Sequence, residues 1–202
     1  MFWKDYGKTI RRMWLNQFGA LAFALMLSFI STTVAKKVPD YSTLVYVVSG
    51  VIGVFFYGYL IYLVIWELGA QDRIRVDGDR MSPRPHHGIL VGLAYSLPML
   101  VVTGVYFAMT AVYSLASKDV SVVNGTLNVT GMMSLVIEAP YVGFALAIFG
   151  EIGKRIAEES MLYYGVFWFV SSLPILLVCW LGYLAGYHGK FMAWAYKRKK
   201  QN

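Results

Sequence analysis

Long runs without a charged residue constrain the fold of this chain more than any other feature. The runs extend over Trp14–Val34, Leu44–Trp66, Gly88–Ser117 and Ser160–Tyr187. The first two contain 21 and 23 residues, and a helix needs about 20 apolar residues to cross the ~30 Å hydrocarbon core of a bilayer. The sequence therefore predicts an all-α integral membrane protein with four transmembrane helices, at about residues 14–34, 44–66, 88–116 and 160–187.

The composition agrees with this fold class. Only 14% of the residues are charged and 58% are hydrophobic, whereas soluble domains carry about 25% charged residues. A net charge of +7 could indicate nucleic acid, but 16% aromatic residues and long apolar runs favour a membrane surface, so no nucleic-acid partner is expected. The longest polar segment, of 21 residues, is too short to bury a core of its own. Residues 1–202 are therefore expected to form a single membrane domain.

The N-terminal segment alternates aromatic and basic residues. Its aromatic and apolar positions recur at helical spacing, with lysines and arginines mostly between them, which predicts an amphipathic helix that lies in the headgroup layer before the first span. The following run, Trp14–Val34, is longer than the ~7–15 residues of a signal-peptide core, so we expect it to be retained as a transmembrane helix. The apolar positions are Phe2, Trp3, Tyr6, Ile10, Met13, Trp14 and Phe18, and the basic ones are Lys4, Lys8, Arg11 and Arg12.

The segment 132–159 is predicted to be helical without crossing the membrane. Pro140 disfavours helix at the residue before it, so a break is expected near Glu138-Ala139-Pro140. The apolar piece before that break would give roughly 11 Å of helix, which suits a re-entrant or surface segment. Residues 150–159 pair their own charges at three- and four-residue spacing and are expected to form a surface helix. Before this segment, residues 118–131 are predicted to be a polar loop, with glycosylation sequons at Asn124 and Asn128 that matter only in a eukaryotic secretory pathway.

The distribution of lysine and arginine predicts which side each loop occupies. Four spans place 13 of the 18 basic residues inside and 5 outside, whereas five spans, with residues 132–150 crossing, place 10 inside and 8 outside. The positive-inside rule favours four spans with both termini in the cytoplasm, and five spans remain the alternative. A bacterial plasma membrane is the expected location.

The polar segment Glu67–His87 is the first candidate for a functional site. Its arginines could hold anionic lipid headgroups or phosphates, because each guanidinium is a forked donor. Its acids and histidines could form a polar or metal-binding cluster, although Asp77-Gly78-Asp79 lacks EF-hand spacing and no bound metal is expected. The simplest interpretation is a loop whose arginines keep it inside, with Asp77-Gly78 as a tight turn. The arginines are Arg73, Arg75, Arg80 and Arg84, and the cluster is Asp72, Asp77, Asp79, His86 and His87.

Glu138 is the second candidate, because it is the only acid within an otherwise apolar stretch. Ionisable residues inside membranes are costly and tend to be functional, so Glu138 is a possible proton or ion site. The alternative is that it faces water at the break or caps the following helix. A similarity between Tyr95–Val102 and Ser171–Val178, both containing Ser-Leu-Pro, would fit an inverted-repeat transporter if it reflected a true repeat.

Three function classes follow from these features. The first is a non-enzymatic subunit or scaffold of a membrane complex, with basic cytosolic faces that contact lipid headgroups or a membrane or cytosolic protein. The second is a small transporter or permease subunit that uses Glu138 and the proline-broken helices. The third is a lipid-modifying enzyme that uses the Asp/His cluster. The first explains the sequence without a dedicated site, and the chain contains no nucleotide-binding, hydrolase or zinc-protease motif, so neither a catalytic residue nor a cofactor is predicted.

Overall fold

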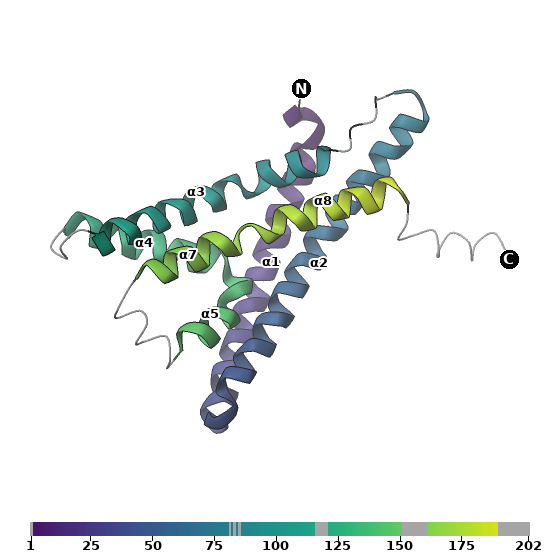
Figure 1. The fold of residues 1–202 in the computed structure, drawn as a ribbon. Coiled ribbons are helices and arrows are strands. Elements are labelled where there is room, and N and C mark those ends of the chain that lie inside the picture. The colour runs from purple at the N-terminus through teal and green to yellow at the C-terminus, as the bar shows by residue number, and fades with distance from the viewer. Residues whose placement is uncertain are drawn as a thin grey trace. The chain divides into compact units, whose positions relative to one another are not determined.

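A computed structural model describes residues 2–80, 82, 84, 86–115, 121–150 and 161–189, with side chains from residue 6 onward and, in the fourth helix, from residue 126 onward. Most of these residues are helical, and none of them lies in a strand (Figure 1). The elements are α1 (Phe2–Lys37), η1 (Pro39–Tyr41), α2 (Ser42–Asp77), α3 (His87–Leu115), α4 (Ser121–Ile137), η2 (Ala139–Tyr141), α5 (Val142–Phe149), α7 (Leu162–Ser171) and α8 (Pro174–Tyr187). The predicted all-α class is confirmed for the described part of the chain.

Four stretches of the described chain are long and apolar enough to cross a membrane. They contain 32, 39, 29 and 26 residues, and each overlaps one of the four predicted spans: Tyr6–Lys37, Pro39–Asp77, His87–Leu115 and Leu162–Tyr187. Helix α2 alone has 36 residues, about 54 Å at 1.5 Å per residue, which exceeds the ~30 Å of a hydrocarbon core. A helix of this length either tilts or extends beyond the apolar layer.

The sequence predicted that the N-terminal segment would be a separate interfacial helix, and this prediction was wrong. It is the first part of α1, which continues without a break from Phe2 to Lys37. The predicted apolar face is confirmed in part, because Tyr6, Ile10 and Met13 are buried, whereas Phe18 is 63% exposed. These side chains pack against protein, and no proline or turn signal interrupts the helix where a change of direction was expected.

The polar segment Glu67–His87 also differs from the predicted loop. Residues up to Asp77 continue α2, and the predicted turn at Asp77-Gly78 is the C-terminal end of that helix. Asp79 has the positive φ of 54° that ends many helices, its backbone N–H donates to Val76 O, and the Arg80 N–H donates to Arg75 O. This pair of bonds is a Schellman motif, which satisfies carbonyl groups at the helix end.

Helix α4 begins eleven residues earlier than the predicted segment, at Ser121 instead of residue 132. The sequons at Asn124 and Asn128 therefore lie in a helix and not in a loop. Leu127 is buried, and the Thr130 hydroxyl donates to the Thr126 carbonyl one turn earlier. Packing and local hydrogen bonding thus outweigh the turn propensity of the polar residues.

The predicted break beside Pro140 is confirmed. Helix α4 ends at Ile137, and the axes of 126–137 and 139–149 differ by 83°. This bent pair is either a broken span or a re-entrant loop. The predicted span at 160–187 is also interrupted, between α7 and α8 at Ser172-Leu173, just before Pro174. The predicted surface helix 150–159 and the basic C-terminal residues from 190 onward lie outside the described residues.

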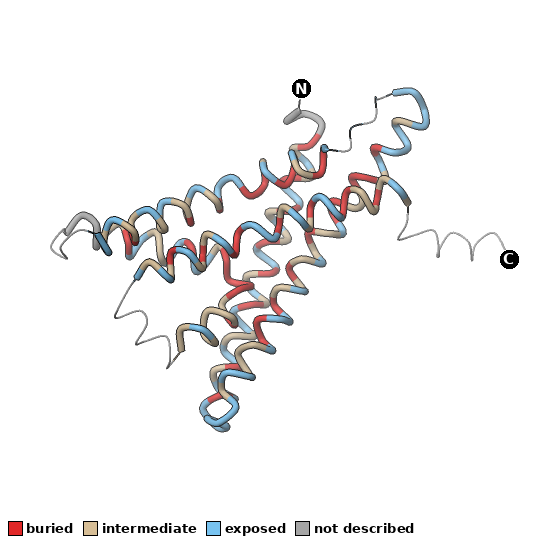
Figure 2. The backbone as a smooth tube through the Cα atoms, in the orientation of Figure 1, coloured by how far each residue is buried: buried red, intermediate tan, exposed pale blue. Residues whose placement is uncertain are grey.

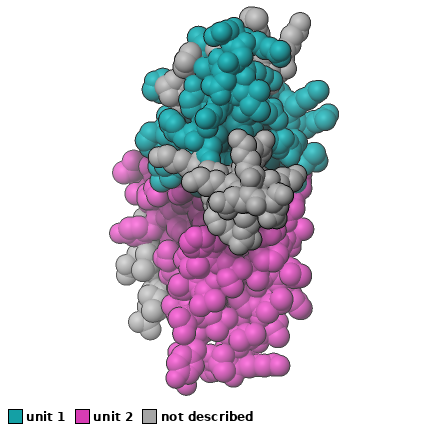
Figure 3. Space-filling model, turned by 90° about the vertical axis from the view of Figure 1, so that its right-hand side faces the viewer, with its two compact units in different colours: residues 1–16, 58–95, 175–202 teal, residues 17–57, 96–174 magenta. Residues whose placement is uncertain are grey.

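The chain divides into two compact units by internal contacts, shown in teal and magenta in Figure 3. Unit 1 contains residues 1–16, 58–95 and 175–202, and unit 2 contains residues 17–57 and 96–174. Buried and exposed residues alternate along most helices (Figure 2). Large apolar side chains such as Phe29 and Phe55 are each 75% exposed. Such an outer surface is expected of helices surrounded by lipid.

Candidate functional site

A buried carboxylate, Asp72, is the centre of the most extensive polar cluster among the described residues of unit 1. It lies on α2 within the polar segment, and none of its surface is exposed. A buried charge is stable only when it is paired and hydrogen-bonded. The groups around Asp72 therefore decide what this site can do.

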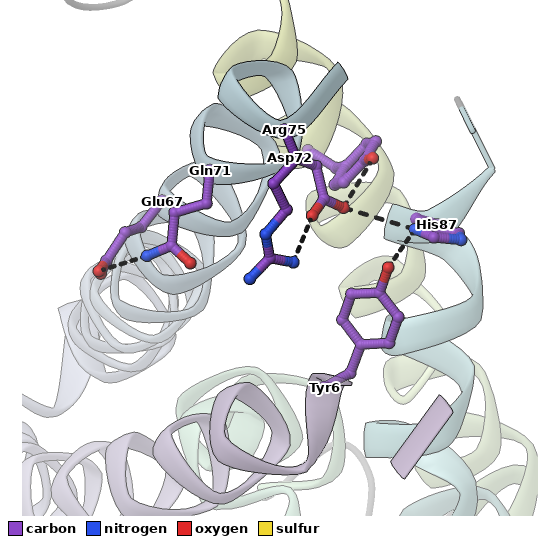
Figure 4. Close-up of polar contacts among 7 residues, drawn as sticks. Tyr6, Glu67, Gln71, Asp72, Arg75 and His87 are labelled. Atoms are coloured by element: carbon purple, nitrogen blue, oxygen red, sulfur yellow. Dashed lines mark hydrogen bonds and ion pairs between the residues drawn. The ribbon is translucent and has the colours of Figure 1, made fainter. Parts of the chain in front are cut away.

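Three side chains approach the two carboxylate oxygens of Asp72. The Arg75 Nη1–H donates to Oδ1 over 3.2 Å, and the Tyr183 hydroxyl donates to Oδ2 over 3.1 Å. The His87 Nδ1 lies 3.4 Å from the same Oδ2. Figure 4 shows the guanidinium of Arg75 and the ring of His87 turned toward the carboxylate. Asp72 is thus held by a residue of its own helix and by residues of α3 and α8.

Tyr6 brings α1 into the same cluster. Its hydroxyl lies 2.5 Å from His87 Nδ1, and the two rings meet edge to face at a centroid distance of 5.0 Å (Figure 4). This contact is shorter than the one between His87 and Asp72. In the neutral Nε2–H tautomer of His87, Nδ1 accepts a hydrogen bond from the Tyr6 hydroxyl. A ring with a proton on Nδ1 would instead donate from that atom to Asp72. The cluster brings together side chains from the described parts of α1, α2, α3 and α8.

Glycines place Tyr183 within reach of Asp72. A Cβ added at Gly186 would lie 2.0 Å from the Trp66 carbonyl oxygen, and one added at Gly69 would lie 2.3 Å from the Tyr183 carbonyl oxygen. On the other side, a Cβ at Gly88 would lie 2.5 Å from the Tyr183 Cβ. Only glycine permits such close approach, so α8 packs directly against the backbones of α2 and α3.

A second ion pair lies nearby, between α1 and α2. The Arg12 Nη1–H donates to Glu67 Oε2 over 2.8 Å, and the two side chains are 55% and 43% exposed. Gln71 donates to the other oxygen of Glu67 over 3.2 Å. Exposed pairs of this kind contribute about 0–1 kcal/mol, so this pair orients the two helices more than it stabilises them.

The structure gathers only part of the predicted Asp/His cluster. Asp72 and His87 meet, whereas Asp77, Asp79 and His86 are exposed. Asp77 pairs with Arg73 over 3.5 Å on the surface of α2. Among the described residues, no group of three or more His, Cys, Asp or Glu side chains could hold a metal ion. We call the contacts of Asp72 with Arg75, His87 and Tyr183 a structural clasp.

The predicted arginines have different environments. Arg75 is drawn to Asp72 with its side chain 45% exposed, and Arg73 pairs with Asp77. Arg80 and Arg84 are exposed, and their side chains form no hydrogen bond or ion pair with any described residue. These two guanidinium groups are free to contact an anion from outside the chain.

Glu138 is buried in unit 2, at the break between α4 and α5. It is 2% exposed, and no described group donates a hydrogen bond to its Oε1. It occupies the N-cap position of η2 but makes no capping hydrogen bond with its side chain. Neither alternative considered for this residue, exposure to water or capping of the next helix, therefore applies. The position of the break was predictable from Pro140, but the burial of the side chain was not.

Sequence reasoning did not identify Tyr6 or Tyr183 as partners of the polar segment. Tyr6 is one of several aromatic residues in the basic N-terminal segment, and Tyr183 lies in an uncharged run, so neither was distinguished from its neighbours. A tyrosine near the end of an apolar helix was the only available signal, because its hydroxyl needs a partner when it is buried. Comparison of the chain with protein-family models, with curated proteins and with solved structures gave no match.

Proposed function

We propose that this chain is a non-enzymatic component of a membrane complex, a subunit or scaffold, whose basic cytosolic face contacts anionic lipid headgroups. The observation that carries the proposal is that the acid and the arginines of the polar segment have different environments. The buried carboxylate of Asp72 is occupied by internal partners, while the guanidinium groups of Arg80 and Arg84 remain exposed and unpaired among the described residues. The clasp around Asp72 would hold the shape of the cytosolic face, and the exposed guanidinium groups of Arg80 and Arg84 would attract anionic headgroups.

The orientation of the chain forms part of the proposal. Both termini and the polar segment are placed in the cytoplasm, because that arrangement puts 13 of the 18 lysines and arginines inside. A bacterial plasma membrane, with an anionic inner surface, is the proposed location. Each basic residue near such a surface contributes about 1 kcal/mol of attraction.

The enzyme alternative has less support from the geometry. It needed Asp77, Asp79 and the two adjacent histidines to converge, and within the described residues only His87 approaches a buried carboxylate. Asp72 is fully buried and accepts hydrogen bonds from Arg75 and Tyr183, so it does not reach a substrate outside the cluster, as a general base would have to. These internal contacts support a structural role for Asp72.

Lipid-dependent stability tests this proposal. The full chain is purified in mild detergent, and its unfolding temperature is measured with added phosphatidylglycerol or with phosphatidylcholine of the same chain length. We expect the anionic lipid to give the larger increase, and 0.5 M salt to reduce the difference because exposed charges are then screened. Co-purification in the same detergent would identify the protein partner of the complex.

Two matched variants localise the effect. Arg80→Gln with Arg84→Gln should remove most of the difference between the lipids. The control, Lys36→Gln with Lys37→Gln, also removes two exposed positive charges, at the C-terminal end of α1. This control should keep the difference between the lipids. Equal stabilisation of the unmodified chain by both lipids, or an equal loss in both variants, would refute the proposed headgroup contact.

A further inference from the structure

The environment of Glu138 is unusual because two buried polar atoms on one helix face lack partners. Ser134 lies four residues before Glu138, its surface is fully buried, and its Oγ makes no hydrogen bond with any described group. Residues at this spacing lie above one another on the same face of a helix, with Cβ atoms about 5–6 Å apart. The unsatisfied oxygens of Ser134 and Glu138 therefore belong to one small polar site in unit 2.

The backbone around this site is already satisfied. The Glu138 N–H donates to the Ser134 carbonyl over 2.8 Å, and the Tyr141 N–H donates to the Glu138 carbonyl over 2.9 Å. The Gln17 side chain of α1 donates to the Ile137 carbonyl. The groups of this site that lack a hydrogen-bond partner among the described residues are the Glu138 carboxyl group and the Ser134 hydroxyl group.

Close packing keeps the site closed. A Cβ added at Gly53 of α2 would lie 2.8 Å from the Pro140 carbonyl oxygen, and one added at Gly143 would lie 2.3 Å from the Gly50 N. Elements α5 and η2 therefore lie directly against the backbone of α2 at Gly50 and Gly53. Water would have to separate these backbones in order to hydrate the carboxyl group.

No described cation neutralises Glu138. The charged side chains described in unit 2, besides Glu138, are Lys36, Lys37 and Asp40, all exposed and none paired with it. The titratable groups buried on the elements packed around it are tyrosines, Tyr141 of η2 and Tyr57 of α2. A carboxylate in this position would be a buried charge without a counter-ion, which costs several kcal/mol.

A proton satisfies this site more simply than a metal ion does. Mg²⁺ and Ca²⁺ require about six to eight oxygen ligands, whereas the orphaned groups here are one carboxyl and one hydroxyl. A protonated carboxyl group removes the charge and adds an O–H donor, and the Ser134 hydroxyl can both accept and donate. The chemistry of the available groups thus favours a neutral carboxylic acid.

We propose that Glu138 and Ser134 form a buried proton-binding site at the break between α4 and α5, and that release of the proton requires this break to open. The carboxyl group holds the proton while the site is closed, and the carboxylate formed on release needs water that only an opened break admits. The site does not depend on the headgroup contact proposed above. Reversible protonation at a helix break is also what the transporter alternative would need.

Infrared spectroscopy of the full chain in detergent tests the proposal directly. A protonated carboxyl group has a C=O band separate from those of carboxylate and amide groups, and the band shifts in D₂O. At neutral pH we expect this band in the unmodified chain, its loss in Glu138→Gln, and its retention in Asp40→Asn, the matched control at an exposed acid. Ser134→Ala should shift the band, because the acid loses the unpaired hydroxyl one turn before it.

Stability against pH provides a second readout. The folded chain keeps a proton that an unfolded glutamate releases above its ordinary pKa of about 4.3. The unfolding temperature should therefore fall as the pH rises from about 4.3 through neutrality. Glu138→Gln, which is neutral at every pH, should lose this dependence and be at least as stable as the unmodified chain in alkaline solution. The proposal is overturned if the band is absent at neutral pH, if it persists in Glu138→Gln, or if sodium in place of choline removes it at constant pH.

Discussion

The crossing of α8 over α2 gives the sharpest stability prediction, for the substitution Gly186→Ala. The added Cβ would lie 2.0 Å from the Trp66 carbonyl oxygen, whereas real Cβ contacts essentially never fall below 3.0 Å. The obstructing atom belongs to the backbone and cannot rotate away, so α8 must move from α2 by about 1 Å or more at this point. Forced repacking of this kind costs about 1–3 kcal/mol.

The same displacement acts on the polar cluster. Tyr183 is one turn before Gly186, and its hydroxyl donates to Asp72 over 3.1 Å. A shift of about 1 Å would stretch that bond beyond hydrogen-bonding range, and a bond to a charged group contributes about 1.5–3 kcal/mol. The cost of Gly186→Ala should therefore be smaller in a Tyr183→Phe background, where this bond is already absent.

Thermal unfolding in detergent, followed by tryptophan fluorescence, measures both effects. For a chain of 202 residues, the repacking cost alone corresponds to a decrease of about 2–12 °C in the unfolding temperature. Gly19→Ala is the matched control, because nothing lies within 4 Å of the position of its Cβ, and alanine in an open helical position should raise stability by about 0.5–1 kcal/mol. An unfolding temperature for Gly186→Ala equal to that of Gly19→Ala would refute the close crossing.

Three further predictions follow from the described contacts. Asp72→Ala should destabilise the chain by about 3–5 kcal/mol, because it leaves buried partners without their anion. Arg75→Ala removes a half-exposed partner and should cost about 1 kcal/mol or less. Similar unfolding temperatures for the two variants would contradict the clasp. Gly53→Ala should lower the unfolding temperature and change the carboxyl infrared band, because its Cβ would lie 2.8 Å from a backbone oxygen of the break, whereas Gly58→Ala, with its nearest neighbour at 3.9 Å, should do neither. A reporter fused to the C-terminus should be active only when it is of the type that works in the cytoplasm, and activity restricted to the outer side would favour five spans.

Much of the helical framework was predictable from the sequence because it depends on local composition. Four uncharged runs gave the four candidate spans, and Pro140 gave the position of the break, since proline restricts the residue before it whatever the surroundings. Proline was less decisive elsewhere. The two Ser-Leu-Pro segments have different structures, because α3 continues through Pro98 while the chain breaks before Pro174. Neighbouring packing decides whether a helix tolerates a missing N–H.

The candidate sites, by contrast, depended on contacts between distant residues. The sequence singled out Asp72, His87 and Glu138 as costly polar residues, but it did not show that Tyr6 and Tyr183, 66 and 111 positions from Asp72 along the chain, complete the cluster. Nor did it show that Glu138 is buried without a partner. A charge in an apolar sequence indicates only that burial would be expensive. Whether partners offset that cost is decided by how the helices pack, and here they surround one acid with donors and leave the other without any among the described groups.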